Sequence, residues 1–364
     1  MAVFLATSGH SGVDRVMKNL LPSIASRGIK VDLLHVKKHG PYLDNTSGNL
    51  RKVELGSSHA ITSLVPLVQY LKKEKPDVLL SDKYRVNRIA LLALKISRVP
   101  VDVFVRLGTT VSIDLESRKP HECWIERRSI SLLYPWAKAV LTPSEAAAQD
   151  LSDYTRLSRD RIVVVRSPVA TPELYEKASS PVNHPWFSNK TVPVIVGVGE
   201  LSGRKDFETL IKAFAILRKH RPSKLVIIGK GRRKGALDTL VAELGMEKDI
   251  FFPGFLQNPY AYMAKADLYV HSSRWEGAPV ALIEAVTLGI PVVSTDCLSG
   301  PREILQDGLF GKLVPVADVE AMCQAMSATL EDPPDPAHTV LAARPYTLES
   351  ATDNHIDILG LNPD

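Results

Sequence analysis

Hydrophobic and polar positions along this chain follow two periods, and one order of predicted elements occurs twice. Each copy has a short apolar run, a glycine-containing loop, an amphipathic segment of helical spacing and a second apolar run. Short β-branched runs that alternate with helices are typical of a parallel sheet covered by helices. The sequence therefore predicts an α/β protein with two doubly wound, Rossmann-like domains that face a central cleft. The first copy comprises Ala2–Thr7, 8–12, Val13–Ser26 and Lys30–Val36, and the second comprises Val194–Val198, 199–205, Asp206–Lys219 and Lys224–Ile228.

A proline-rich segment separates the two copies. Its four prolines between 168 and 185 block a long helix or a central strand, so we interpret it as a linker. Further strands are expected at Val78–Leu80, Val101–Val105, Ala139–Thr142, Ile162–Val165, Leu268–Ser272 and Val292–Ser294, and a last helix at Leu348–Leu359. We predict a first domain over residues 1–168, a linker over 169–190, a second domain over 191–340 and a C-terminal helical segment over 341–364.

Two glutamates flank the start of one short predicted helix in the second domain. A proline suits its first position and a glycine follows its end, so the helix is expected over about 279–288. Glu276 lies just before it and Glu284 about a turn and a half inside. The amides around Gly277–Ala281 form an anion site, and flanking carboxylates can hold hydroxyls of a sugar or ribose attached to a phosphate. The alternative is a plain strand-loop-helix whose N-terminal acid favours the helix dipole.

Two loops of the second domain are expected at the same edge of its sheet. Arg204 and Lys205 follow one strand, and Glu276 follows another. Ligands of open α/β sheets bind beyond the carboxyl ends of the strands, where these cations and helix amides could neutralise a diphosphate. The loop Gly9–Gly12 has the equivalent place in the first domain. Solvated surface charge is the alternative for Arg204 and Lys205.

Several cofactor classes lack their motifs. The loop at Gly9 is not a G-x-G-x-x-G fingerprint, and no acidic residue closes a strand about 20 residues later, so a dinucleotide cofactor is not expected. No D-x-D, H-E-x-x-H or G-x-x-x-x-G-K-[ST] sequence occurs, so no metal is expected to hold the diphosphate. The site is predicted to work without a bound cofactor or metal.

The charge of the chain is uneven. The net charge is +5, but residues 1–168 carry 26 lysines and arginines against 16 acidic residues, which gives +10. This half favours an anionic partner such as a phosphate-bearing acceptor or a membrane surface, and a solvated basic surface is the alternative. Nucleic acid is not expected, because no RNP-like aromatic run or zinc knuckle occurs. No apolar run reaches the ~18–20 residues of a spanning helix, so we expect a cytoplasmic protein with peripheral contact at the inner membrane face.

One segment mixes aromatic and basic residues. Residues 122–136 contain three aromatic side chains, including Trp124 and Trp136, beside Arg127 and Arg128. This is the composition of an interfacial helix. The favoured interpretation is that its apolar residues face the sheet of the first domain.

With these residues in view, the chain resembles the retaining group 1 glycosyltransferases, also called family 4, which have the GT-B fold. The E-x7-E segment that begins at Glu276, the loop ending at Lys205, and the segments at Gly289 and Gly300 occur in the family's order. The resemblance is strong over Val194–Val316 and weaker in the first domain.

The resemblance implies roles for the site residues. Lys205, with Arg204, would hold the diphosphate of a nucleotide-sugar donor, and Glu284 would hold its ribose. Glu276 would be the catalytic residue beside the transferred sugar, and the last helix would cross back to the first domain, which would bind the acceptor. The remaining donor-side residues implied are Gly277, Ala278, Pro279 and Val280. Gly9 and Gly12 are candidates from the position of their loop, whose backbone could approach the donor phosphates or the acceptor.

Two departures from the family pattern affect this assignment. The arginine that the family places after the loop's first glycine is Glu200 here, and Arg204 is the candidate to replace its charge. The histidine often found in the first domain's active-site loop is absent from 103–110. His10 and Arg106 are the candidates on the acceptor side, and neither is preferred.

The predicted function is transfer of a hexosyl or N-acetylhexosaminyl group, with retention, to a glycan or lipid-linked acceptor in bacterial surface polysaccharide or lipopolysaccharide synthesis. Two alternatives stay open: a nucleotide-sugar epimerase of the same fold, and a non-catalytic sugar-nucleotide-binding protein. An epimerase would need no acceptor.

Overall fold

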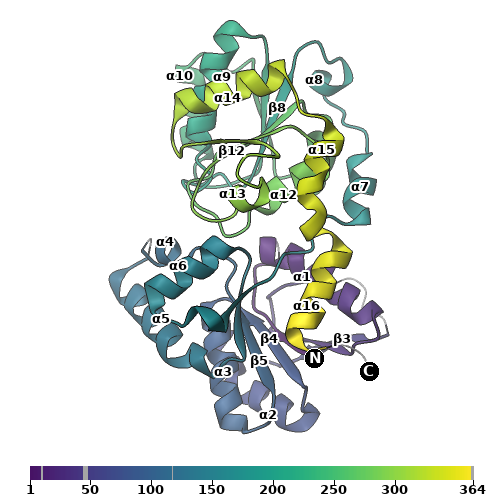
Figure 1. The fold of residues 1–364 in the computed structure, drawn as a ribbon, viewed down its shortest axis with the longest axis vertical. Coiled ribbons are helices and arrows are strands. Elements are labelled where there is room, and N and C mark those ends of the chain that lie inside the picture. The colour runs from purple at the N-terminus through teal and green to yellow at the C-terminus, as the bar shows by residue number, and fades with distance from the viewer. Residues whose placement is uncertain (10, 44–47, 117, 362–364) are drawn as a thin grey trace. The chain divides into compact units, whose positions relative to one another are not determined.

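The computed structural model describes residues 1–9, 11–43, 48–116 and 118–361 and divides the chain into two compact units. The first unit contains Met1–Val169 and Tyr346–Asp364, and the second contains Ala170–Pro345 (Figure 1). Among the described residues, no helix combines the length and the apolar character needed to cross a bilayer.

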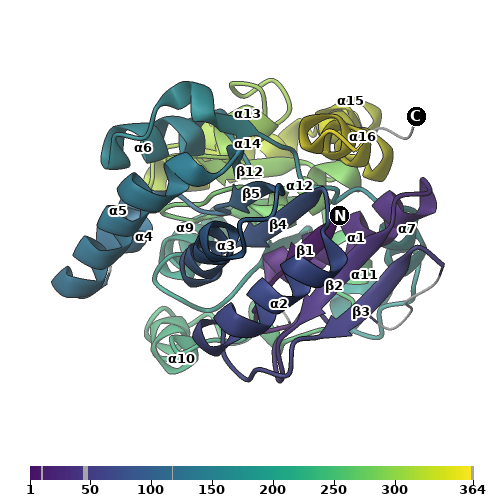
Figure 2. The same ribbon diagram turned by 90° about the horizontal axis from the view of Figure 1, so that it is seen from below.

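The first unit is built on a seven-stranded parallel sheet with the order β3-β2-β1-β4-β5-β6-β7. Successive residues of a strand point to opposite faces, so Phe4 packs under α2 and α3 while Val3 packs under α1 and α16. Figure 2 shows five of these strands side by side in the order β3, β2, β1, β4 and β5. The strands are β1 (Ala2–Phe4), β2 (Val31–His35), β3 (Leu50–Glu54), β4 (Val78–Asp82), β5 (Asp102–Arg106), β6 (Ala139–Thr142) and β7 (Ile162–Val164). The helices are α1 (Gly12–Ser26), α2 (Leu64–Glu74), α3 (Tyr84–Ser97), α4 (Val111–Glu116), α5 (Pro120–Leu133), α6 (Glu145–Thr155) and α16 (Leu348–Leu359).

The C-terminal helix α16 is part of the first unit. Ile356 and Leu359 are buried in its core beside α1. Arg27 at the end of α1 forms an ion pair of 2.7 Å with Asp353. The chain therefore returns to the first unit after completing the second.

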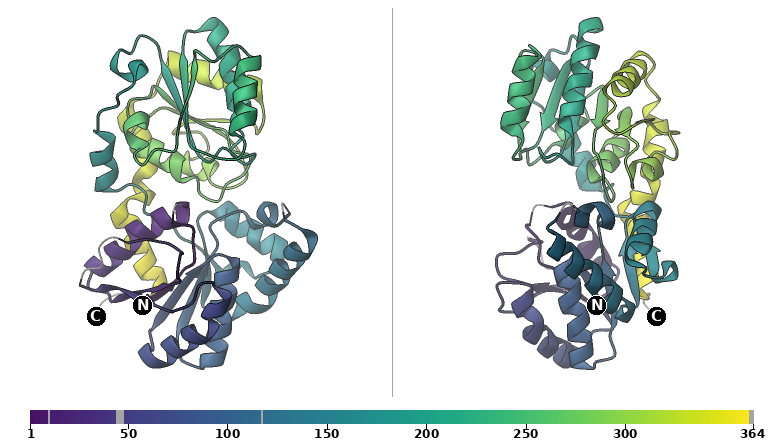
Figure 3. Two further views of the ribbon diagram at one scale, coloured as in Figure 1. Left: turned by 180° about the vertical axis from the view of Figure 1, so that it is seen from behind. Right: turned by 90° about the vertical axis from the view of Figure 1, so that its left-hand side faces the viewer.

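The second unit repeats this design with six parallel strands in the order β10-β9-β8-β11-β12-β13. Helices α9 and α14 pack together over one face, and α12 packs against β11 and β12 on the other (Figure 3). The strands are β8 (Val194–Val198), β9 (Lys224–Ile228), β10 (Ile250–Gly254), β11 (Leu268–His271), β12 (Val292–Thr295) and β13 (Lys312–Val314). The helices are α7 (Pro172–Ala178), α8 (Pro185–Ser188), α9 (Phe207–His220), α10 (Lys234–Glu243), α11 (Tyr260–Met263), α12 (Val280–Thr287), α13 (Pro301–Ile304), α14 (Val319–Glu331) and α15 (Pro336–Val340).

Both sheets reverse their strand order at one place. In the first unit this is between β1 and β4, and in the second between β8 and β11. Such a switch point is where open α/β sheets bind ligands, because the loops after the two strands diverge to opposite faces. The loops after β8 and β11 contain the residues singled out in the sequence.

The predicted fold class, two Rossmann-like doubly wound units of the GT-B type, is confirmed, with local differences. Strands β3, β10 and β13 were not expected. Pro279 is the N-cap of α12 rather than its first helical residue, and Gly289, with φ +69°, follows the helix as expected. The segment predicted as a linker begins with α7, which packs against α11 in the second unit, because Pro172 suits the first position of a short helix.

Candidate active site

The loop after β8 carries the two candidate cations, and the loop after β9 holds it in place. The Gly199 amide donates to the Ile228 carbonyl oxygen at 3.0 Å. A Cβ at Gly229 would lie 1.8 Å from the Gly199 carbonyl oxygen, and one at Gly231 would lie 2.3 Å from that of Leu201. The two loops thus contact each other backbone to backbone, which requires glycine on the β9 side.

The loop after β11 carries Glu276 and is held by the last residue of β12 and by residues that follow this strand. The Thr295 hydroxyl donates to the Ser273 carbonyl oxygen at 2.6 Å, and the Ser299 hydroxyl donates to that of Gly277 at 2.8 Å. Gly300, at φ +97°, lets the chain pass close to Pro279. These hydrogen bonds hold the backbone before and after Glu276 in place.

The two loops are also joined directly. The Ser272 hydroxyl donates to the Lys205 carbonyl oxygen at 2.7 Å, and the Arg274 amide donates to that of Arg204 at 2.8 Å. These bonds make one connected platform at the switch point of the second unit.

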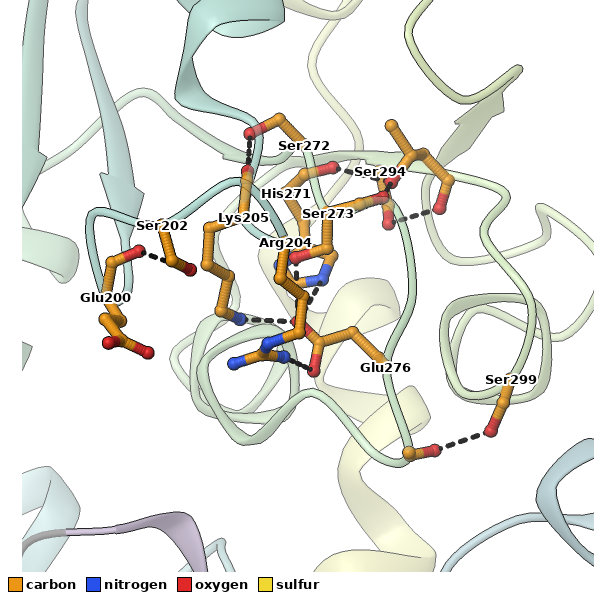
Figure 4. A network of polar contacts seen from close by, with 12 residues as sticks. Glu200, Ser202, Arg204, Lys205, His271, Ser272, Ser273, Glu276, Ser294 and Ser299 are labelled. Carbon is orange, nitrogen blue, oxygen red and sulfur yellow. Dashed lines mark hydrogen bonds and ion pairs between the residues drawn. The ribbon is translucent and has the colours of Figure 1, made fainter. Parts of the chain in front are cut away.

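At the centre of the platform both cations bind the same carboxylate (Figure 4). Lys205 Nζ lies 2.6 Å from Glu276 Oε1, and Arg204 Nη1 lies 2.5 Å from Oε2. The Ser273 hydroxyl donates to Oε1 at 2.7 Å. Burial acts to raise the pKa of the Glu276 carboxyl, but Lys205 and Arg204 outweigh it and hold this pKa well below its ordinary value. Two cations that converge on one carboxylate can also converge on phosphate oxygens.

Exposure distinguishes the two cations. The Lys205 side chain is nearly buried, whereas a third of the Arg204 side chain is exposed. Glu200, which occupies the family's arginine position, is exposed, and its side chain lies apart from Glu276 (Figure 4). Arg204 therefore supplies the second positive charge of the cluster, and its expected role in place of the family's arginine stays a prediction.

Glu284 lies inside α12 and is buried. The Tyr260 hydroxyl donates to its Oε1 at 3.0 Å. Burial, then Glu284 and then Glu276, raises the pKa of Tyr269, which places both glutamates near this tyrosine. The amides from Gly277 to Val280 lead into the start of α12, where the first N–H groups of a helix lack an intrahelical acceptor. The Leu282 amide of this turn already donates to the Pro279 carbonyl oxygen at 3.0 Å.

The candidates of the first unit are arranged differently. Gly9 has φ +84°, and the ring of Tyr42 packs directly against it. A Cβ at this position would lie 2.3 Å from the ring. Gly12 is the first residue of α1. His10 lies outside the described residues. The structure therefore gives Gly9 a packing role, and contact with the donor phosphates stays a prediction.

Arg106 is buried at the end of β5. Its Nη1 lies 2.8 Å from Asp82 Oδ2 at the end of β4, and its Nη2 donates to the Ser167 hydroxyl at 3.1 Å. Only 3% of the surface of Arg106 is exposed. Its contacts connect the end of β5 to the end of β4 and to Ser167 within this unit. Its predicted contact with an acceptor stays untested.

Sequence reasoning missed three polar residues near Glu276 and Glu284: His271, Tyr269 and Tyr260. His271 and Tyr269 lie two residues apart on β11, so they share one face of the sheet. A histidine that ends an apolar strand beside a candidate ligand loop was the available signal.

Two family models match the chain. Residues 183–345 match the glycosyl transferases group 1, and residues 10–172 match glycosyltransferase family 4. These matches fall on different halves of the chain.

Curated relatives agree with the family models. The chain is 29% identical to an N-acetylgalactosamine-N,N'-diacetylbacillosaminyl-diphospho-undecaprenol 4-alpha-N-acetylgalactosaminyltransferase of Campylobacter jejuni, over 91% of this chain and 90% of that protein. It is 26% identical to the lipopolysaccharide core biosynthesis glycosyltransferase LpsE of Rhizobium meliloti, over 97% and 96% of the two chains.

Solved structures of the same fold include Anabaena HepE in complex with UDP, with a TM-score of 0.77 at 16% identity over 99% of both chains. The apo lipopolysaccharide outer core galactosyltransferase WaaB has a TM-score of 0.74 at 20% identity, also over 99% of both chains. The resemblance noted in the sequence is confirmed: the chain is a glycosyltransferase and belongs to group 1, family 4, with the GT-B fold.

Proposed function

We propose that this glycosyltransferase uses a nucleotide-diphosphate sugar, with UDP as the favoured nucleotide, and transfers the sugar with retention to a glycan or lipid-linked acceptor. The observation that carries the proposal is the convergence of Lys205 and Arg204 on Glu276 at the switch point of the second unit. The name of the Campylobacter relative includes a diphospho-undecaprenol acceptor and an N-acetylhexosamine, which supports the acceptor and sugar classes. HepE, whose complex contains UDP, supports the nucleotide.

The cluster suits departure of a diphosphate. Lys205, Arg204 and the first-turn amides of α12 would hold its oxygens and stabilise the negative charge that develops as the sugar leaves. Glu284 would bind the ribose, and Glu276 would contact the transferred sugar. Because two fixed cations already supply positive charge, the reaction is proposed to need no metal ion or other cofactor. Turnover that is unchanged by EDTA is the expected result.

Donor binding is the direct test. UDP-, GDP- and ADP-sugars are screened by thermal shift, and the best donor is titrated against the wild-type protein and the variants Lys205→Met and Glu284→Ala. Loss of a charge partner for a buried phosphate weakens binding by about 2–5 kcal/mol, and we expect Lys205→Met to do so. Lys219→Ala, which removes an exposed lysine near the end of α9, is the matched control. If both Lys205→Met and Glu284→Ala bind the donor as the wild type does, the site assignment is wrong.

The two other enzyme and binding interpretations predict different products. An epimerase converts the donor without an acceptor, and a non-catalytic binding protein leaves it intact. Product analysis by NMR with and without an acceptor glycan separates the three cases. The anomeric configuration of the transferred sugar in the same spectra tests retention.

Contact with an anionic membrane face is also proposed for the first unit. The side chains of Trp124 and Leu132 on α5 are each 63% exposed, so the favoured expectation that this segment is a core helix was wrong for them. The Arg128 guanidinium lies 5.8 Å from the Trp124 ring centre, and Lys95 Nζ lies 5.1 Å from that of Trp136. Exposed aromatic and basic side chains together favour a membrane interface.

Vesicle sedimentation tests this contact. Binding to anionic vesicles should be weakened by about 0.5 M salt, which shortens the Debye length well below 10 Å. Trp124→Ala should weaken it too, whereas Tyr175→Ala, at another exposed aromatic residue, should not. Attachment that ignores salt would count against a charge-based contact.

A further inference from the structure

His271 is a buried side chain next to the donor cluster that the proposed mechanism leaves without a role. It ends β11, and its imidazole is buried directly beside Glu276 (Figure 4). Its Nε2 lies 3.6 Å from Glu276 Oε1, beyond hydrogen-bond distance, and has no hydrogen-bond partner among the described residues. A buried, unpartnered N–H group is costly, so its presence calls for an explanation.

The other ring nitrogen of His271 has a partner that favours one tautomer. Nδ1 lies 3.4 Å from the hydroxyl of Tyr269, which is fully buried two residues earlier on the same strand. Burial, aided by the positive charge of Lys205, lowers the pKa of His271 to about 3, so its imidazole is neutral at physiological pH. When Tyr269 donates to Nδ1, the single imidazole proton is on Nε2 and faces Glu276.

A donor diphosphate would compete with Glu276 for the two cations that now hold it. In the present arrangement Lys205 and Arg204 neutralise the carboxylate. A bound diphosphate carries more charge than one carboxylate and competes for the same N–H groups. Glu276 would keep the Ser273 hydroxyl, which lies 2.7 Å from Oε1, but would lose Lys205 and Arg204 to the diphosphate.

We propose that His271 is a positioning residue, which hydrogen-bonds to Glu276 when a donor diphosphate binds Lys205 and Arg204. A shift of a few tenths of an ångström brings Nε2–H within hydrogen-bond distance of Oε1. The bond keeps the carboxylate ionised and aimed at the transferred sugar without adding a positive charge that would bind the phosphate. This inference rests on the proposed donor site and assigns to it a residue that acts through Glu276.

Kinetics of two variants test the exchange of partners. His271→Leu removes the N–H group at similar volume, and His271→Gln can place an amide N–H close to the position of Nε2. Loss of a hydrogen bond to a charged group should lower kcat about 10- to 100-fold in His271→Leu. UDP affinity should stay within about twofold, because Lys205 and Arg204 still bind the diphosphate. His271→Gln should recover most of the lost kcat, and Tyr269→Phe should fall between the wild type and His271→Leu.

A merely structural role predicts another result. Removal of an unpartnered buried N–H group should leave the melting temperature of the donor-free protein unchanged or raise it. A lower melting temperature together with weaker UDP binding would overturn the proposal, as would a wild-type kcat in His271→Leu. A crystal structure with UDP supplies a direct measure: the distance from His271 Nε2 to Glu276 Oε1 should be below about 3.2 Å.

Failure of this inference is distinguishable from failure of the proposed function. If the wild-type protein turns over a UDP-sugar but His271→Leu does so equally well, the donor site stands and the positioning role falls. If both Lys205→Met and Glu284→Ala bind UDP as the wild type does, the donor site itself is wrong.

Discussion

The two units share a strand order and a switch point, but they use their charges in opposite ways. In the first unit, Arg106 and Asp82 form a pair in which both side chains are at most 4% exposed. In the second, Lys205 and Glu276 form a similar pair, and partly exposed Arg204 adds a further cation. The first arrangement is neutral and closed. The second has one more positive than negative charge, and Arg204 is exposed enough for a ligand to reach it. The shared fold therefore sets where the charged residues lie, and the identity of the side chains determines whether they can bind a ligand.

The first way to test this comparison is to break the closed pair. Arg106→Met leaves Asp82 buried and unpaired, and such a change destabilises proteins by about 3–5 kcal/mol. Lys205→Met should cost less stability, because Arg204 and Ser273 still hold Glu276. Urea unfolding measures the loss, and hydrogen exchange of peptides from β4 and β5 shows whether it lies in the first unit.

The double variant Arg106→Met with Asp82→Asn is the control for this change. It removes both charges and should regain part of the lost stability. If Arg106→Met unfolds like the wild type but loses turnover, Arg106 contacts the acceptor directly and its structural interpretation is wrong.

The loop glycines provide a second test. Gly229→Ala places a methyl group against the Gly199 backbone, which cannot move without displacing Lys205. Overpacking at a position with φ +151° should destabilise the protein by about 1–3 kcal/mol and weaken donor binding. Gly9→Ala in the first unit should have a smaller effect, because the partly exposed Tyr42 ring can move. Thermal unfolding with and without UDP measures both effects.

The matched control for the glycine variants is Gly235→Ala in α10. No described atom lies within 4 Å of a Cβ there, and the residue has ordinary helical geometry. Alanine in a helix should be neutral or stabilise by about 0.5–1 kcal/mol. Equal losses in Gly229→Ala and Gly235→Ala would show that the contact between the two loops does not matter.

Local sequence chemistry predicted the loops of the site but not their contacts. The charged residues after β8 and β11 were expected at the same edge of the sheet, because the carboxyl ends of parallel strands lie along one edge. Glu276 lies more than 70 residues after the two cations in the sequence. Their contact depends on the three-dimensional arrangement of the side chains, and a local sequence pattern contains no information about it. His271 carries no periodic signal, and only its place at the end of an apolar strand, before a candidate ligand loop, could have identified it.

Two of the three missed strands, β3 and β10, have separate physical causes. The sequence Leu50–Glu54 is mostly charged, because β3 is an edge strand with an exposed face. The strand β10 contains Pro253, which indicates a strand end in isolation but is tolerated at the edge of the second sheet. Both errors arise from neighbours that only the folded sheet supplies.

The smallest expected effect is on the pH dependence of stability. The carboxyl groups of Glu276 and Asp82 should change this dependence in opposite directions. The pKa of Glu276 is lowered from its ordinary value of 4.5 by Lys205 and Arg204, so the unfolded state binds more protons and this group stabilises the protein above about pH 4.5. That contribution is lost as the pH falls toward the lower folded pKa. The pKa of Asp82 is raised by burial from 3.8, so the folded state binds more protons and stability falls as pH rises above about 3.8.

Glu276→Gln should therefore flatten the loss of stability on acidification, and Asp82→Asn should steepen it. Urea midpoints measured at intervals from about pH 4 to 7 give the slopes, which report the proton balance of each group. Slopes are compared rather than absolute stabilities, because each substitution also removes an ion pair. Parallel curves for the two variants would mean that the open cluster and the closed pair hold their carboxylates in the same electrostatic state, and the contrast between the units would then have to lie in accessibility alone.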